Sequence, residues 1–357
     1  MRHLSTIASV IFLMTLVGGP LGCSRKRLAE KLDRQARGAD VYRTMCAVCH
    51  GPEGRGYAAD QAPALAAHEF LASASDAYLR DAIALGRSNT TMSAWGVSRG
   101  GPLSGGDVDA VIAFMRLWDR GPVEVADERP LAGDPGRGAE IYARDCERCH
   151  GARGIGGPYL HIGSFDVLSD ATNGYLRFAI ARGRSRTPMK PFAASLGASG
   201  VDDTVALLRS WQSTAEPARR STAARTPPLP LGPVPLNPHG PAPLGFRTAP
   251  ATTPAAVVKD ELDRHARLAL LDARAPSDYA NQHIIGAVSV PFYDPAPYLR
   301  LLPKDVWYVC YCACPHAESG QLAKKLMAAG FKNVTVLDEG LGVWQARGYG
   351  TRSGVDP

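Results

Sequence analysis

The sequence predicts a multidomain protein in which two copies of a small all-α domain precede an α/β domain with a parallel sheet. Three features of the 357 residues predict this fold class. The motif C-x-x-C-H occurs twice, 100 residues apart, within similar surroundings. A proline-rich segment follows the second copy. Beyond it, short apolar runs alternate with helical stretches, which is the pattern of a parallel sheet covered by helices.

Composition and charge exclude two function classes. The chain is 45% hydrophobic and 21% charged, and 40 Lys and Arg residues against 34 Asp and Glu give a net charge of +6. It has no basic stripe with interleaved aromatic residues, so we expect no nucleic-acid partner. The N-terminus holds the only stretch apolar enough to matter for membranes, and this excludes a multi-span membrane protein.

The N-terminus predicts export. A basic residue precedes the apolar run 4–17, which is too short to span a bilayer and is followed by small residues. This is typical of a signal peptide, here 1–22. Leu21-Gly22-Cys23 resembles the lipobox of bacterial lipoproteins, although Pro20 stands where that family usually has leucine. The resemblance implies a lipid on Cys23 and a periplasmic protein, anchored to the outer membrane because Ser24 follows. The alternative is ordinary cleavage that leaves Cys23 as a thiol.

The internal repeat extends beyond the two motifs. Residues 78–92 match 175–189 at an offset of 97, and Trp118 matches Trp211 at an offset of 93. Slowly changing offsets indicate one domain present twice, with small deletions in the second copy. The predicted organisation is a signal peptide 1–22, a tether 23–35, a first copy 36–120, a linker 121–135, a second copy 136–212, a proline-rich linker 213–255 and a last domain 256–350.

Each C-x-x-C-H motif predicts one covalently attached haem. Two thiols add to the vinyl groups of the porphyrin, and the histidine that follows binds the iron. Zinc is the rival, but one such motif offers only three ligands. The predicted cofactors are therefore two haem c groups. They are attached through Cys46, Cys49, Cys146 and Cys149, with His50 and His150 on the iron. The two copies resemble class I cytochrome c domains, and this resemblance implies electron transfer with a redox partner protein or a membrane electron-transport chain.

The second axial ligand is predicted from the alignment of the copies. Met92 and Met189 occupy the same position in a polar loop, and a thioether is a known haem ligand. Met115 competes in the first copy, but it lies in a run with helical spacing and is interpreted as core. His68 and His161 do not align with each other and are interpreted as bystanders.

Two helices should frame each haem. The first enters the binding motif over 38–45 and 138–145, and the last covers 107–118 and 202–211. In the cytochrome family these helices cross at a glycine with aromatic residues packed beside it. Gly38, Tyr42 and Trp118 fit this pattern, as do their counterparts in the second copy. The proline-rich segment that follows, with 11 prolines from Pro217 to Pro254, is predicted to be an extended tether.

The last domain has four predicted strands, 268–272, 287–291, 306–310 and 334–337, and helices between them. It resembles the rhodanese domain. One signature is Leu271-Asp272-Ala-Arg274 with Asp278-Tyr279, and the other combines Gly330-Phe331 with Val343-Trp344. The resemblance implies a cysteine at the end of the central strand, in a loop that opens into a helix. Backbone N–H groups there stabilise a thiolate.

Cys312 takes this nucleophile position and is expected to carry a persulfide. Cys314 is the alternative nucleophile, and Cys310 is expected to be buried within the strand. The loop differs from the family's C-x-x-G-x-R-S because it is one residue longer, lacks the arginine and carries Glu318. The missing cation disfavours thiosulfate, which is a dianion, and also disfavours phosphatase chemistry. Glu318 would oppose the thiolate unless it points outward.

The sequence therefore predicts a periplasmic dihaem cytochrome c with a rhodanese-like domain. In the sharper hypothesis, Cys312 accepts sulfane sulfur from a donor and has sulfurtransferase activity, while the haems remove electrons from a reduced sulfur compound. In the alternative hypothesis, the last domain is a non-catalytic docking or sensing module of an electron shuttle.

Overall fold

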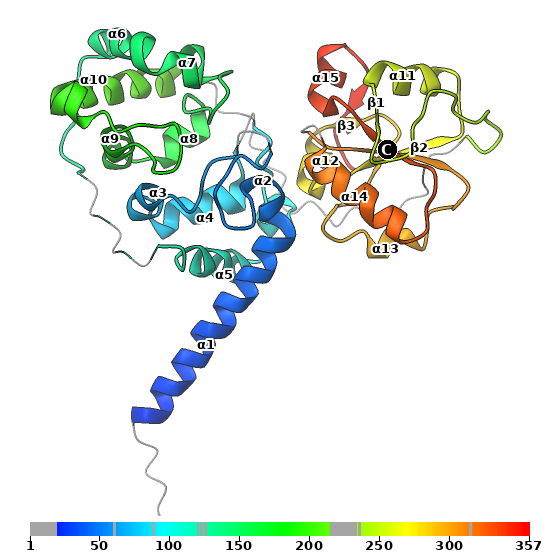
Figure 1. Cartoon of the computed structure of the whole chain (residues 1–357), viewed down its shortest axis with the longest axis horizontal. Coiled ribbons are helices and arrows are strands. Elements are labelled where there is room, and N and C mark those ends of the chain that lie inside the picture. Colours follow the sequence, from blue (N-terminus) through cyan, green and yellow to red (C-terminus); the bar gives the residue numbers. More distant parts are fainter. Residues whose placement is uncertain are drawn as a thin grey trace, which may run out of the picture.

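The structure is a computed structural model that describes residues 20–59, 62–87, 90–119, 121, 124, 127–214, 234, 237–313 and 316–357. Two helical domains lie beside an α/β domain (Figure 1). The predicted signal peptide, except for the backbone of 20–22, lies outside the described residues, and so do Cys314 and the side chain of Cys23.

The first repeat is entirely helical. Ser75 caps α4 by accepting a hydrogen bond from the backbone N–H of Tyr78, and Ser104 forms a capping box with Asp107 at the start of α5. A π-helical turn, Tyr42–Cys46, joins the first helix to the C-x-x-C-H helix. The α-helices are α1 (Pro20–Val41), α2 (Ala47–His50), α3 (His68–Ser73), α4 (Asp76–Leu85) and α5 (Gly105–Met115).

The second repeat has the same order of helices. Asp134 caps α6 and Thr172 caps α9. A residue with positive φ, Gly197, interrupts the last helix, so the helix that follows the break corresponds to α5. The α-helices are α6 (Pro135–Asp145), α7 (Glu147–His150), α8 (Phe165–Asp170), α9 (Asn173–Arg182) and α10 (Ala193–Thr214).

The first and last helices of each repeat cross at a glycine, as the sequence predicts. A Cβ atom on Gly38 would lie 1.9 Å from the carbonyl oxygen of Ala110, and one on Gly138 would lie 2.2 Å from that of Asp203. The aromatic pair beside each crossing is edge-to-face, with centroids 4.9 Å apart for Tyr42–Trp118 and 4.8 Å apart for Tyr142–Trp211. Backbone contact between the helices therefore leaves no room for a side chain at either glycine.

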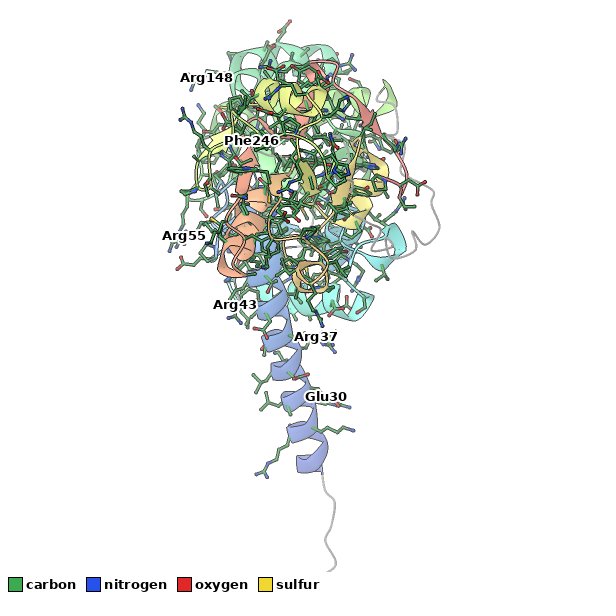
Figure 2. All side chains as sticks on the ribbon, turned by 90° about the vertical axis from the view of Figure 1, so that its right-hand side faces the viewer. Glu30, Arg37, Arg43, Arg55, Arg148 and Phe246 are labelled. Carbon is green, nitrogen blue, oxygen red and sulfur yellow. The ribbon has the colours of Figure 1, made fainter. Side chains whose placement is uncertain are left out.

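Helix α1 begins much earlier than the predicted first helix. The segment 23–35, predicted as a tether, is helical and extends away from the domain, with Glu30 in its protruding part (Figure 2). The protruding helix is amphipathic only weakly, and Leu28 and Leu32 are exposed. Within the described ranges, no helix has both the length and the apolar character that a membrane span requires.

The last domain contains a five-stranded parallel sheet, which confirms the predicted fold class. The strand order is β1-β6-β5-β2-β4, and β5 lies at the centre beside β2, with Leu271 opposite Cys310. The four predicted strands are present as β2 (Leu268–Asp272), β4 (Ala287–Ser289), β5 (Trp307–Tyr311) and β6 (Val334–Leu337). The sequence did not predict β1 (Thr252–Thr253) or the antiparallel pair β3 (His283–Ile284) and β7 (Thr351–Arg352).

Alternating residues of the strands face two layers of helices. Ala269, Leu271 and Cys310 pack with Leu322 of α14, whereas Leu268, Leu270 and Val309 pack with Trp344 of α15. The helices are α11 (Ala255–Asp263), α12 (Pro276–Asn281), α13 (Ala296–Leu299), α14 (Ala317–Ala328) and α15 (Gly340–Ala346).

The end of the proline-rich linker packs on this domain, which differs from the predicted free tether. Glu261 accepts hydrogen bonds from the backbone N–H groups of Leu244, at 2.8 Å, and Gly245, at 3.2 Å. Phe246 packs edge-to-face on Trp307 with centroids 5.5 Å apart. Prolines still prevent regular structure here, but one buried carboxylate and one aromatic pair are enough to hold the segment. Residues 215–233 lie outside the described residues.

Candidate functional site: haem pockets beside a cysteine loop

One cavity of about 1090 Å³ contains the candidate site. Pockets for single small ligands range from roughly 300 to 1,000 Å³, so this cavity has room for more than one group. Its wall includes every residue predicted to hold haem: Cys46, Cys49, His50, Met92, Cys146, Cys149, His150 and Met189. Ala313 and Arg274 of the last domain also line it. The structure thus brings the residues of both repeats and the cysteine loop to one space.

The two motif histidines are oriented in the same way. His50 Nδ1 donates to the carbonyl oxygen of Pro63 at 3.0 Å, and His150 Nδ1 donates to that of Leu160 at 3.0 Å. This bond fixes the tautomer and leaves Nε2 as the metal-binding atom. Burial lowers the pKa of both histidines. Both rings are therefore held neutral, which is the form that binds iron.

The motif cysteines lie on the same wall. Burial raises the pKa of Cys46 to about 12, and burial together with the Asp145 charge raises that of Cys146 to about 11. Both groups stay protonated thiols until they are bonded. The short helices α2 and α7 place each cysteine pair beside its histidine, as one helical turn requires.

The methionine loops of the two repeats have the same hydrogen bonds. The backbone N–H of Arg87 donates to Met92 O at 3.0 Å, and that of Arg184 donates to Met189 O at 2.8 Å. In each loop a threonine hydroxyl accepts from the methionine N–H at 3.1 Å. Both methionines are partly buried on the cavity wall.

The residues that could replace Met92 or Met189 as iron ligands lie in other surroundings. Met115 is 2% exposed within α5, in the core, although it also contributes to the cavity wall. His68 Nδ1 lies 2.6 Å from Asp119 Oδ2 and is not part of the wall. His161 does line the cavity, so it is the one competitor that shares the site with Met189.

The cavity fits haem in its polar groups as well. Among the described residues, the buried Nη2 atom of Arg87 has no hydrogen-bond partner, whereas its Nη1 atom pairs with Asp170. A buried guanidinium nitrogen on a cavity wall suits an anionic group, such as a haem carboxylate. The repeat carries a signal for Arg87, because Arg184 occupies the same position in the second copy.

Cys312 lies at the end of the central strand β5, as predicted. It is fully buried, and its Sγ atom lies 3.3 Å from Ser319 Oγ in the first turn of α14. His316, just before α14, has a positive φ of 73°, and its Nε2 atom lies 2.9 Å from Asp338 Oδ1. Cys310 is buried within β5. Cys314, the alternative nucleophile, lies outside the described residues.

Glu318 points inward. Its side chain is buried, and burial together with the nearby Cys312 raises its pKa well above the usual range. The sequence did not determine the direction of Glu318, and it predicted an easily formed Cys312 thiolate only if Glu318 points outward. The inward position therefore disfavours the thiolate whenever Glu318 is ionised. Arg274 is the cation nearby, but it forms a bidentate pair with Asp272, at 2.9 and 2.6 Å.

Family models match the three domains. A model described as cytochrome C oxidase, cbb3-type, subunit III matches residues 33–115 and 133–208, and the rhodanese-like domain model matches residues 254–347. The chain carries two cytochrome c domains and a rhodanese-like domain. We refer to these as cytochrome domain 1, cytochrome domain 2 and the rhodanese-like domain. The two cytochrome matches are consistent with two covalent haem groups.

Solved structures are similar to parts of the chain. A rhodanese-like domain from Anabaena sp. is 28% identical and covers 31% of this chain and 82% of its own, with a TM-score of 0.28. A reducing HAO-like protein complex of Kuenenia stuttgartiensis is 20% identical and covers 50% and 96%, with a TM-score of 0.35. A thiosulfate sulfurtransferase from Pseudomonas aeruginosa is 26% identical and covers 29% and 20%, with a TM-score of 0.24. No curated protein matches the chain significantly.

The two cytochrome domains contact each other directly. Glu69 accepts a hydrogen bond from the backbone N–H of Ser185 at 2.7 Å, and Arg87 pairs with Asp170. The guanidinium group of Arg184 lies 5.9 Å from the ring centroid of Phe70. These contacts join two domains that the sequence predicted only as separate units.

Proposed function

We propose that this protein is a periplasmic electron-transfer cytochrome whose rhodanese-like domain holds sulfane sulfur on Cys312 while a reduced sulfur compound is oxidised. The observation that carries the proposal is the shared cavity, whose wall includes both C-x-x-C-H motifs and Ala313, the residue next to Cys312. Sulfur bound at this loop lies close to groups that accept electrons, so the two chemistries need no separate carrier between them.

Each group of residues has a defined part. The four motif cysteines, the two histidines and the two loop methionines would hold the haem groups, which supply one-electron acceptance when bound. Cys312 is the residue that receives the sulfur atom. The Ser319 hydroxyl lies within hydrogen-bond distance of Cys312 Sγ and can donate to a thiolate or a terminal sulfur there.

Location and partners follow from the N-terminal segment. Export and a lipid on Cys23 would place the protein at the periplasmic side of the outer membrane, where covalent haem attachment and soluble redox partners are compatible. Helix α1 would then separate the cytochrome domains from the membrane surface. Electrons would leave to a redox partner protein or to a membrane electron-transport chain, and a sulfane-sulfur donor would load Cys312.

A second candidate function has an observation in its favour. Cys312 is fully buried, and Glu318 faces it, so the thiol itself has neither the exposure nor the cationic neighbour typical of a reactive cysteine. This favours a rhodanese-like domain that serves as a docking or sensing module of an electron shuttle.

Stopped-flow spectroscopy distinguishes the two candidates. Oxidised protein is mixed with sulfide, polysulfide or thiosulfate, and haem reduction is followed in the wild type and in Cys312→Ser, which keeps the size and removes the sulfur. The proposal expects reduction by at least one compound in the wild type and its loss in the variant. Equal rates in both proteins would favour the docking module.

A further inference from the structure

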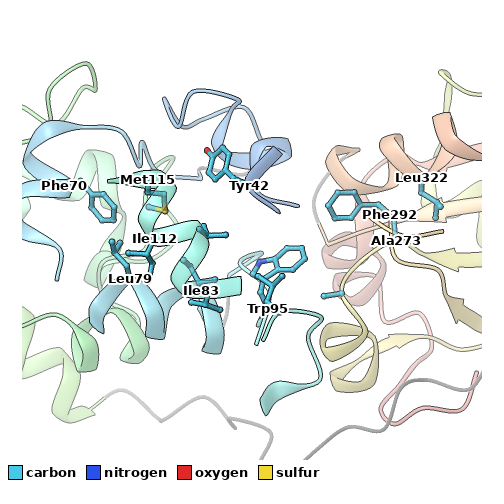
Figure 3. Packing of buried hydrophobic residues seen from close by; sticks show 14 of the residues in the cluster. Tyr42, Phe70, Leu79, Ile83, Trp95, Ile112, Met115, Ala273, Phe292 and Leu322 are labelled. Atoms are coloured by element: carbon cyan, nitrogen blue, oxygen red, sulfur yellow. The ribbon is translucent and has the colours of Figure 1, made fainter. Parts of the chain in front are cut away.

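The loop that carries Met92 in cytochrome domain 1 is docked on the rhodanese-like domain. The Ser93 hydroxyl donates to a carboxylate oxygen of Asp278, and the Ser277 hydroxyl donates to Ala94 O at 3.0 Å. Trp95, which is 5% exposed, lies with its ring centroid 5.7 Å from that of Tyr293. Figure 3 shows Trp95 at the side of cytochrome domain 1 that faces the rhodanese-like domain. Three consecutive residues after Met92 therefore form a junction with α12 and its surroundings.

A second contact joins the two domains near the cysteine loop. Helix α2, which carries Cys49 and His50, contacts α14, which carries Glu318 and Ser319. The equivalent loop of cytochrome domain 2 is different. Among the described residues, no hydrogen bond, ion pair or ring contact joins residues 190–192 to the rhodanese-like domain, and Lys190 instead lies 5.2 Å from the ring centroid of Phe192. Within the part of the chain that the structure describes, cytochrome domain 1 is thus the one whose methionine loop is docked on the rhodanese-like domain.

Glu318 lies beside Cys312, and two further acidic groups lie near Glu318. Glu318, Asp278 and Asp272 lie close enough to affect one another electrostatically. Burial raises the pKa of Glu318 and Asp278, and the bidentate pair with Asp272 occupies Arg274. A dianion such as thiosulfate would be repelled here, and Arg274, the cation beside these groups, is already paired with Asp272. An uncharged sulfur compound avoids both problems.

We propose that this junction is a sulfide-oxidising site, in which hydrogen sulfide is joined to Cys312 and cytochrome domain 1 is the point of electron entry. This inference rests on the proposed function and adds the substrate class and the route. The step is Cys312–SH + H₂S → Cys312–S–SH + 2 H⁺ + 2 e⁻. One S–S bond forms and two S–H bonds break, and the two electrons equal the capacity of the two cytochrome domains, one electron each.

The carboxyl groups of the junction provide the route for the protons. A protonated carboxyl both donates and accepts a hydrogen bond, so it can pass a proton on without holding a net charge. Glu318 lies beside Cys312, and Asp278 lies within electrostatic range of Glu318 and is hydrogen-bonded to Ser93 of the junction. The sulfur site thus loses two protons toward solvent as the electrons leave toward cytochrome domain 1.

The internal repeat supplies a matched control for the test. Ser93→Glu places a longer acidic side chain against Asp278 and should separate the junction, whereas Lys190→Glu places the same residue at the equivalent, exposed position of cytochrome domain 2. Ser277→Glu disturbs the junction from the rhodanese-like side, which guards against misfolding of cytochrome domain 1. Sulfide is mixed anaerobically with each oxidised holoprotein. Haem reduction is followed by absorbance, and sulfur on Cys312 is located by mass spectrometry.

We expect Ser93→Glu and Ser277→Glu to slow sulfide-driven haem reduction at least about tenfold. The added carboxylate would be repelled by Asp278 or by the Ala94 carbonyl oxygen, and this repulsion opposes docking. Lys190→Glu should match the wild type. All variants should still accept sulfur on Cys312 from an uncharged organic trisulfide, since this transfer needs no electron acceptor. Equal reduction rates in all four proteins would overturn the proposal that electrons enter at this junction, and the proposed function would still stand. A wild type that neither reduces haem nor gains sulfur would overturn the proposed function itself. Faster reduction by thiosulfate than by sulfide would overturn the substrate class.

Discussion

Tyr78 and Tyr175 occupy the same position in the two cytochrome domains and stack on each other, with ring centroids 4.8 Å and planes 29° apart. Each ring also carries an equivalent arginine from its own domain, since Arg87 lies 5.1 Å from the Tyr78 centroid and Arg184 lies 5.5 Å from the Tyr175 centroid. Identical residues that meet in this way relate the two domains by approximate two-fold symmetry. This symmetry explains how both haem pockets open into one cavity.

We expect two covalent haem groups per chain. Denaturation in acid should leave the haem absorbance with the polypeptide, because thioether bonds survive unfolding. Quantifying haem against protein concentration should give two per chain, and one in a variant with Cys146→Ala and Cys149→Ala. A wild-type protein with a single haem, or with none, would contradict this assignment.

Met189 is expected to be the second axial ligand of cytochrome domain 2. Thioether ligation gives oxidised haem a weak far-red band and a more positive potential than a second histidine does. Met189→Ala should abolish the part of this band that belongs to cytochrome domain 2, and His161→Ala should leave it in place. The assignment would be wrong if His161→Ala changes the spectrum and Met189→Ala does not. The same comparison applies to Met92 and Met115 in cytochrome domain 1.

Gly38→Ala should destabilise cytochrome domain 1 by at least about 1–3 kcal/mol, because the new Cβ atom would meet the Ala110 carbonyl oxygen at 1.9 Å. The contact is with backbone, so it cannot be relieved by a change of rotamer. Gly105→Ala is the matched control, since nothing lies within 4 Å of its Cβ position, and it should change stability by no more than about 1 kcal/mol. Denaturant titration followed by far-ultraviolet circular dichroism measures both effects.

Asp202 should make cytochrome domain 2 sensitive to acid. Burial alone would raise the pKa of Asp202, but hydrogen bonds from Arg177, at 2.7 Å, and Arg129 outweigh it and lower the pKa. A carboxylate with a lowered pKa stabilises the fold above its unfolded pKa, and this contribution is lost as the pH falls through the folded value.

The corresponding variant removes one partner of a buried pair. Asp202→Asn should cost about 3–5 kcal/mol at pH 7 and flatten the loss of stability between pH 5 and pH 3. Asp109→Asn is the control, because the Arg80–Asp109 pair is exposed and water screens it, so its loss should change stability little. Unfolding midpoints of the wild type and both variants, measured across this pH range, test this difference. Equal costs for the two variants would show that Asp202 is not held as described.

The stability of the Glu318→Gln variant relative to the wild type should increase as the pH rises. Burial raises the pKa of Glu318 in the folded protein, so the fold binds a proton that the unfolded chain has already released. Stability contributed by this group is present below the unfolded pKa and decreases as the pH rises toward the folded pKa. The wild type should therefore lose more stability than the variant between pH 5 and pH 8. Parallel pH profiles would indicate that Glu318 is ionised in the folded state.

Much of this molecule could be predicted from its sequence. The repeat gave both cytochrome domains and every candidate haem ligand, because covalent haem attachment requires cysteines and a histidine at fixed spacing. The strands β2 and β6 were predicted to the residue, since continuous apolar runs form strands buried on both faces. The two-residue strands β1, β3 and β7 could not be predicted, because they depend on pairing with distant partners and carry no periodicity of their own.

What only the tertiary structure decided is where these units meet. Ser93 and Asp278 lie 185 residues apart in sequence and share a hydrogen bond at the junction. The inward direction of Glu318 depends on how α14 packs against the sheet, and no local pattern encodes it. Spacing along the chain therefore determined which cofactor each domain can hold. Packing within the rhodanese-like domain decided that Glu318 faces Cys312. Packing between domains, which joins surfaces with no shared periodicity, decided which cytochrome domain lies beside it.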